Sequence, residues 1–105
     1  MPLYTFVMDY NGGTYIAQVR AYSPTIAVGK WAKELDQEAV HGISAKSKPK
    51  LIRQIKDETL SPVTGILNTW CVSTILLGKL ALIHFVKTDY PELAATRLRS
   101  SKDVN

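Results

Sequence analysis

The run YTFVMDYNGGTYIAQVRA, residues 4–21, places two alternating stretches of apolar and polar residues on either side of Asn-Gly-Gly. A two-residue hairpin turn that matches the twist of its strands requires a positive φ at both central positions. Asn11-Gly12 or Gly12-Gly13 adopts this conformation at low cost, so the run predicts a β-hairpin. Ser23-Pro24 follows directly, and a serine N-cap with proline at the first helical position is typical of a helix start.

Either turn gives the hairpin the same two faces, because side chains alternate along a strand and only a loop of odd length would exchange them. One face is apolar, and we expect it to form the core: Tyr4, Phe6, Met8 and Tyr10 with Tyr15, Ala17 and Val19. The other face mixes polar residues with Val7 and Ile16. We expect it to meet water or a loosely packed neighbour.

A second hairpin is predicted over residues 70–87, where β-branched and aromatic residues crowd two apolar stretches. With Gly78-Lys79 as a type II′ turn, His84 faces Ser73 and lies diagonal to Cys71. Neither face of this hairpin is polar throughout, whereas an antiparallel pair usually has one wet face. The pattern therefore favours cover from both sides.

Helices are predicted between and after the hairpins. The first begins at Ser23 and ends near Gly42, with an apolar stripe at helical spacing made of Ala27, Val28, Trp31, Ala32 and Leu35. The second begins at Pro49, is stopped by Ser61-Pro62, and turns Leu51, Ile52 and Ile55 inward. A third begins at Asp89-Tyr90-Pro91, and the tail from about Ser100 is expected to fray.

The expected fold is a single α+β domain over residues 1–105, with elements in the order ββααββα. It is a two-layer sandwich of one four-stranded antiparallel sheet, made of two hairpins, and two or three helices. Such short helices cover one face well, although the first helix could also cross to the far face. The uncovered side of the second hairpin then requires a partner, either a second copy in a homodimer or another protein. The residues that we expect to bind this partner are Trp70, Val72, Leu76, Ile83 and Phe85.

Composition agrees with an ordinary globular chain: 46% of the 105 residues are hydrophobic and 21% are charged. The single cysteine, Cys71, cannot form an intramolecular disulfide, which predicts a reducing cytoplasm. The N-terminal residues MPLYTFVMDY do not have a signal-peptide pattern, so we read them as a mature start. Residues 66–86 have the length of a membrane span, but Lys79 near their middle argues against one.

A basic segment is the strongest polar feature of the sequence. It contains Lys46, Lys48, Lys50, Arg53 and Lys56 within eleven residues, in a chain of net charge +4. These cations could contact phosphates, which makes a nucleic-acid accessory protein the alternative function. A solvated helix face explains the same pattern, and we favour it. Aromatic residues for base stacking are missing from the sequence between Trp31 and Trp70, so any such binding would be electrostatic.

Catalytic patterns are weak. Cys71, Ser73 and His84 share one face of the second hairpin, where a nucleophile could find a base, and this makes a small enzyme a further alternative. Neither a third, orienting carboxylate nor a glycine-rich elbow accompanies them. Two distant histidines and one cysteine do not form a metal-ligand pattern. We therefore predict a non-enzymatic interaction module without catalytic residues, metal or cofactor.

The run YTFVMDYNGGTYIAQV resembles the opening hairpin of HicB-type antitoxins. The resemblance covers less than a fifth of the chain and ends where Tyr22-Ser23-Pro24 enters a helix directly. Those proteins continue with a third strand and a proline-glycine loop before their helix. The resemblance therefore implies no role for this chain.

Overall fold

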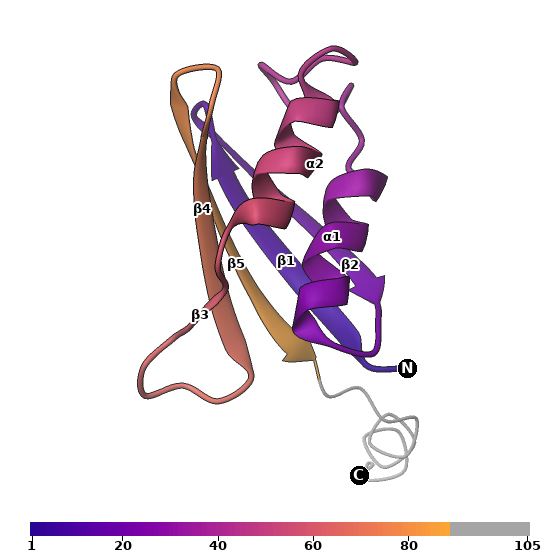
Figure 1. Cartoon of the computed structure of the whole chain (residues 1–105), viewed down its shortest axis with the longest axis vertical. Helices are drawn as coiled ribbons and strands as arrows, with labels where there is room; N and C mark the ends of the chain where they lie inside the picture. The colour runs from indigo at the N-terminus through magenta and orange to yellow at the C-terminus, as the bar shows by residue number, and fades with distance from the viewer. Residues whose placement is uncertain (89–105) are drawn as a thin grey trace, which may run out of the picture.

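The computed structural model describes residues 1–88 and shows one antiparallel sheet of five strands with two helices (Figure 1). The strand order in the sheet is β2-β1-β5-β4-β3, so the two hairpins meet at its centre through β1 and β5. The elements are β1 (Leu3–Tyr10), β2 (Gly13–Arg20), α1 (Pro24–Glu34), α2 (Lys48–Asp57), β3 (Ser61–Pro62), β4 (Thr69–Leu76) and β5 (Lys79–Thr88).

The α+β class and the antiparallel sheet are confirmed, but the predicted number of strands and the predicted order of elements are wrong. Ser61-Pro62 does more than stop a helix: it pairs with Cys71 and Trp70 as a fifth strand, β3. Proline fits there because an edge strand does not need its N–H on the solvent side. The third helix, predicted to begin at Asp89, lies outside the described residues.

The first hairpin turns at Asn11-Gly12, as predicted. Both residues have positive φ, 50° and 82°, and Tyr10 pairs with Gly13. These are the dihedrals of a type I′ turn, whose twist matches that of the strands. The core face of β1 is confirmed, since its alternate residues Tyr4, Phe6, Met8 and Tyr10 are all buried.

The second hairpin turns one residue earlier than predicted. Leu77 and Gly78 occupy the turn with φ of 54° and 77°, so His84 lies opposite Cys71 instead of Ser73. A leucine in the left-handed region costs about 1 kcal/mol. The observed register offsets this cost by placing Trp70 opposite Phe85, with ring centroids 5.5 Å apart. The change in partner is two residues, so the division of side chains between the two faces is unchanged.

The start of α1 is confirmed and its predicted end is wrong. The Ser23 side chain accepts a hydrogen bond from the Ile26 N–H, with Pro24 at the first helical position. The helix ends at Glu34, well before Gly42. The Asp36 side chain accepts a hydrogen bond from the Glu38 N–H, and this local bond competes with helix continuation.

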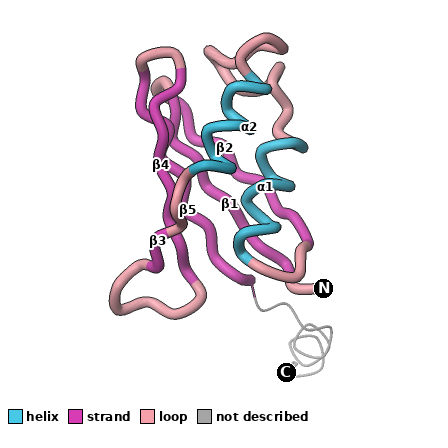
Figure 2. The backbone as a smooth tube through the Cα atoms, in the orientation of Figure 1, coloured by secondary structure: helices cyan, strands magenta, loops and turns pink. Residues whose placement is uncertain are grey.

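Both helices lie on the same face of the sheet, so α1 does not cross to the far side (Figure 2). The helix α1 packs on β2 and β1, and α2 packs on β4. Their apolar residues join one core with the inward residues of the sheet, among them Trp31, Leu51 and Ile55. Within residues 1–88, neither helix has the length and apolar content that a membrane crossing requires.

Aromatic rings form a continuous row through this core. Trp31 of α1 stacks on Phe6 with centroids 5.4 Å apart, and Phe6 stacks on Phe85 at 4.4 Å. Phe85 stacks in turn on Trp70, so the row links α1 to three strands. At the other end of β1, the buried Tyr10 hydroxyl donates to the Leu76 carbonyl at 2.9 Å. Burial raises the pKa of Tyr10 above its ordinary value.

Candidate interaction surfaces

The five residues predicted to bind a partner face the helices. Val72, Leu76, Ile83 and Phe85 are at most 3% exposed, and Trp70 is half-buried against the core. The helices cover this face, so a partner of the folded chain does not reach the four buried side chains. The large apolar side chains of the strands that remain exposed lie on the opposite side of the sheet.

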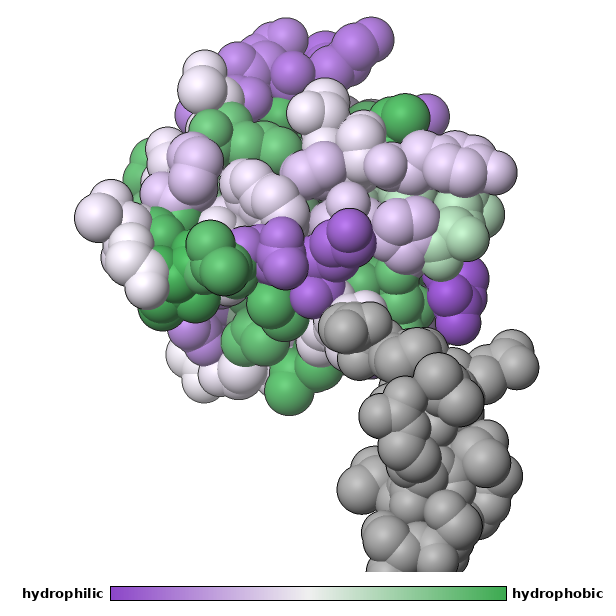
Figure 3. All heavy atoms as spheres, turned by 90° about the horizontal axis from the view of Figure 1, so that it is seen from below, coloured by the Kyte–Doolittle hydropathy of each residue, from purple (hydrophilic) through white to green (hydrophobic). Residues whose placement is uncertain are grey.

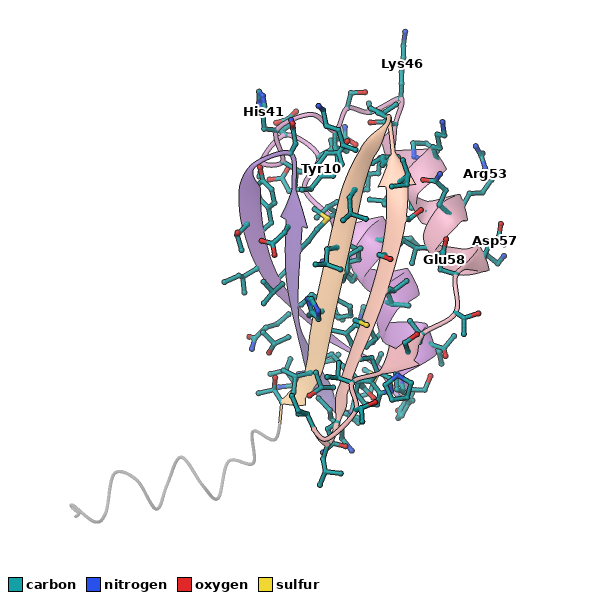
Figure 4. The ribbon with its side chains drawn as sticks, turned by 90° about the vertical axis from the view of Figure 1, so that its left-hand side faces the viewer. Tyr10, His41, Lys46, Arg53, Asp57 and Glu58 are labelled. Carbon is teal, nitrogen blue, oxygen red and sulfur yellow. The ribbon has the colours of Figure 1, made fainter. Side chains whose placement is uncertain are left out.

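We call that opposite side the outer face. Figure 4 shows the helices on one side of the sheet only, with the outer face turned away from them. Its most exposed apolar residues come from three strands: Ile16 of β2, Ile75 of β4, and Leu80 and Val86 of β5. Val7, Cys71 and Leu82 are half-buried between them. The outer face therefore has an apolar band that none of the described helices covers.

Val7 and Ile16 belong to the mixed face of the first hairpin, which the sequence predicts to meet water or a loosely packed neighbour. Val7 and Ile16 are direct cross-strand partners, and Ile16 is 69% exposed. The sequence contained a signal of an interaction surface at this position, because an apolar pair at facing positions of an otherwise polar face contributes little to solubility. The band becomes recognisable only once β5 lies beside β1, because Leu82 and Val86 of β5 then extend it into the second hairpin on either side of His84, the partner of Val7.

Charge on the outer face is sparse. Among its described strand residues, the only carboxylate is Asp9, at the end of β1, and the only arginine is Arg20, at the end of β2. Asp9 accepts a hydrogen bond from the Thr14 hydroxyl at 2.6 Å. Arg20 donates to the Met1 carbonyl at 3.0 Å. Because β1 and β2 are antiparallel, the two charges lie at opposite ends of the sheet.

The residues of the enzyme alternative also lie on the outer face. Cys71 and His84 are direct cross-strand partners, while Ser73 faces Leu82. The thiol is free and half-buried. Within residues 1–88, no group of three or more potential metal-ligating side chains includes this pair. The two grooves described below are lined by other residues. The arrangement thus provides a possible nucleophile and base without an orienting acid.

The structure divides the basic segment. Lys46 lies in the loop before α2, and the other four cations lie on the helix itself. Figure 4 shows Arg53 on the side away from the sheet, with Asp57 and Glu58 close to it at the end of α2. Lys56 instead lines a groove of about 780 Å³ between the helices, together with Lys30 and Lys33 of α1. Lys56 of the basic segment therefore lines the same groove as Lys30 and Lys33, which lie outside this segment in the sequence.

A smaller apolar surface lies at the end of the molecule where β5 finishes. The loop between β3 and β4 exposes Ile66 and Leu67, which are 59% and 87% accessible. Figure 3, which views this end, shows apolar side chains at the surface among polar ones. This loop is separate from the band on the outer face.

Comparison with protein-family models, with curated proteins and with solved structures finds no match for this chain. The outer face can bury apolar area, and the groove between the helices can attract anions. The edge of β2 can extend the sheet.

Proposed function

We propose that this chain is a non-enzymatic interaction module that forms a homodimer through its outer face. The observation that carries the proposal is the apolar band from Ile16 to Ile75 across the side of the sheet that the helices leave open. An exposed apolar patch that spans several strands is typical of a protein–protein interface. A second copy would complete a sandwich in which the two sheets face each other.

The outer face is of the same order of size as the interface of a stable dimer. Strands of eight residues are about 27 Å long, and four of them side by side are about 19 Å wide. The flat area is about 500 Å² before the relief of the side chains is counted. This is of the same order as the roughly 800 Å² per partner that a specific interface buries.

The distribution of charge favours a second copy as the occupant. A two-fold axis between the sheets and across the strands reverses the strand direction of the second copy. The carboxylate of Asp9 in each copy then approaches Arg20 of the other, because these residues lie at opposite ends of the sheet. Two opposite-charge contacts therefore form on the β1–β2 side of the outer face, one of them beside Leu82, the cross-strand partner of Asp9. This electrostatic match specifies orientation more than it adds affinity.

Replacement of Leu82 by lysine should convert the dimer to a monomer. Leu82 is half-buried on the central strand β5, directly opposite Asp9. A lysine there places a charge in the apolar band of both copies and withdraws the Asp9 carboxylate from Arg20 of the other copy. We expect the dissociation constant, measured by sedimentation, to rise roughly a hundredfold. Leu77→Lys is the matched control, because Leu77 is 52% exposed in the turn and not part of the band. A wild-type chain that sediments as a monomer, or two variants that behave alike, would contradict the proposal.

A nucleic-acid accessory role is a second candidate, supported by the three lysines that line the groove between the helices against one carboxylate, Glu58. Lys30 also donates to the Arg20 carbonyl, a bond that a phosphate would have to replace. If Lys30, Lys33 and Lys56 each contact a phosphate, affinity for duplex DNA or RNA should fall about fortyfold between about 50 and about 200 mM salt. Fluorescence anisotropy measures this dependence. The triple variant Lys30→Gln, Lys33→Gln and Lys56→Gln should lose most of this salt dependence. Binding that is absent, or insensitive to salt, would exclude this candidate.

A further inference from the structure

The two edges of the sheet are protected very differently. β3 is a strand of two residues that contains Pro62, and both features prevent further strands from pairing there. β2 forms the other edge over eight residues and contains no proline. Its middle residues Ile16, Ala17 and Gln18 are all exposed. The β2 edge is therefore open to the addition of a strand.

The hairpin turn determines which backbone groups are available at this edge. In a two-residue hairpin, the residues that flank the turn, here Tyr10 and Gly13, exchange hydrogen bonds with each other. Every second residue of β2 from Gly13 onward therefore bonds to β1. Thr14, Ile16, Gln18 and Arg20 direct their N–H and C=O groups outward. The Arg20 carbonyl accepts a hydrogen bond from the Lys30 ammonium at 3.0 Å, which agrees with an outward direction of this carbonyl.

A groove of about 400 Å³ runs beside this edge on the helix side of the sheet. Ala17 lies at its floor and is exposed although its side chain is on the core side, because α1 ends at Glu34 and leaves this part of β2 uncovered. The groove also has apolar walls from Trp31 and Leu35. A side chain of an added strand would find apolar contacts here.

The groove is acidic in a basic chain. Glu34 and Asp36 line it, and its described lining contains no lysine or arginine, whereas the whole chain has a net charge of +4. Both carboxylates belong to exposed residues. Asp36 is held in place by the hydrogen bond that it accepts from the Glu38 N–H at 3.0 Å. This charge is complementary to a cationic ligand.

We propose that the β2 edge binds an extended basic peptide as an additional antiparallel or parallel strand. The peptide backbone pairs with the outward groups of Thr14, Ile16 and Gln18, as in strand addition to an open sheet edge. Alternate side chains enter the groove, a small apolar residue over Ala17 and a lysine or arginine toward Glu34 and Asp36. Pairing of β2 with the β2 of a second copy is disfavoured, because it brings two acidic grooves to the same two-fold axis. This site uses the backbone of β2 and the helix side of the sheet, whereas the homodimer uses side chains of the outer face. Ile16 contributes its backbone to the first and its side chain to the second.

The test is a titration with the labelled peptide KTVTKTV, followed by fluorescence anisotropy, with ETVTETV as the charge-reversed control. We expect the wild-type chain to bind the first peptide and not the second. Ile16→Pro removes one outward N–H and keeps the bonds to β1, so affinity should fall at least about tenfold. Ile16→Thr retains this N–H and should bind within about twofold of wild type.

The acidic rim is tested by the double variant Glu34→Gln and Asp36→Asn. Both changes keep the shape of the side chain, and asparagine can still accept the Glu38 N–H. We expect affinity to fall about fivefold and its salt dependence to weaken. Circular dichroism checks that each variant is folded.

Two results would overturn the peptide site. One is equal binding of the acidic and basic peptides, or binding that neither Ile16→Pro nor the rim variant reduces. The other is self-association that Ile16→Pro abolishes and Leu82→Lys leaves intact, which would assign the edge to a second copy. The Leu82→Lys variant should bind KTVTKTV like the wild-type chain. A variant that loses the dimer and still binds the peptide, or one that keeps the dimer and loses peptide binding, therefore separates the two proposals.

Discussion

Phe85→Ala should lower the free energy of unfolding by about 3–5 kcal/mol, as measured by urea denaturation and circular dichroism. Phe85 is 1% exposed in β5, near the centre of the sheet. Its ring stacks on Phe6 and on Trp70, and the edge of Tyr4 lies 6.1 Å away between centroids. Removal of the ring leaves a cavity, and Phe6 cannot move into it without losing its stacking on Trp31 of α1.

Val86→Ala is the control, because the neighbouring residue points to the outer face and is 38% exposed. Its cost should be below about 1 kcal/mol in the monomeric Leu82→Lys background, where no second copy covers it. A small cost for Phe85→Ala, or equal costs for the two positions, would contradict the assignment of the core to the helix side of the sheet.

Trp31→Ala should destabilise the chain by a similar amount, about 3–5 kcal/mol, for a different reason. Trp31 is 2% exposed and is the residue of α1 that stacks on the sheet, its ring nearly parallel to that of Phe6, with an angle of 7° between planes. A helix of eleven residues is not stable by itself in water, so α1 depends on this contact. Its loss should undock α1 and open the groove beside β2.

Ile26→Ala is the matched control on the same helix, because Ile26 is 56% exposed. It should cost less than about 1 kcal/mol. Hydrogen exchange supplies a second readout, since amides of α1 should exchange faster in Trp31→Ala while those of β5 remain protected under native conditions. Equal destabilisation by both substitutions would contradict the anchoring role of the tryptophan.

Local features of the fold were predictable because their causes are local. The Asn11-Gly12 turn follows from the dihedrals that these residues adopt, and the start of α1 follows from Ser23-Pro24. Strand alternation determines which face of the sheet each side chain occupies. The faces of the second hairpin were therefore predicted correctly, although its register was not. The end of α1 was missed because the hydrogen bond of Asp36 to the Glu38 N–H competes with a helical pattern that reads on toward Gly42.

The candidate surfaces were predictable only in part. Alternation divided the second hairpin into two apolar faces, and the sequence reading chose the one with Val72 and Phe85 as the partner side. The structure buries that face and leaves Ile75 and Leu80 exposed. Nothing in a strand of apolar residues on both faces indicates which face the helices will cover. The acidic groove was missed because Ala17 and Asp36 meet only after α1 folds back on β2.

The amino-acid sequence by itself determined the first hairpin, the beginning of α1 and the partition of each strand into two faces, because φ preferences and side-chain alternation act within a few residues. Tertiary structure decided the register of β4 on β5, the position of β5 beside β1 and the choice of covered face. These depend on contacts between distant residues, such as the stacking of Trp70 on Phe85 and of Phe6 on Trp31. Such contacts outweigh the cost of Leu77 at positive φ, and they become visible only when the elements are assembled.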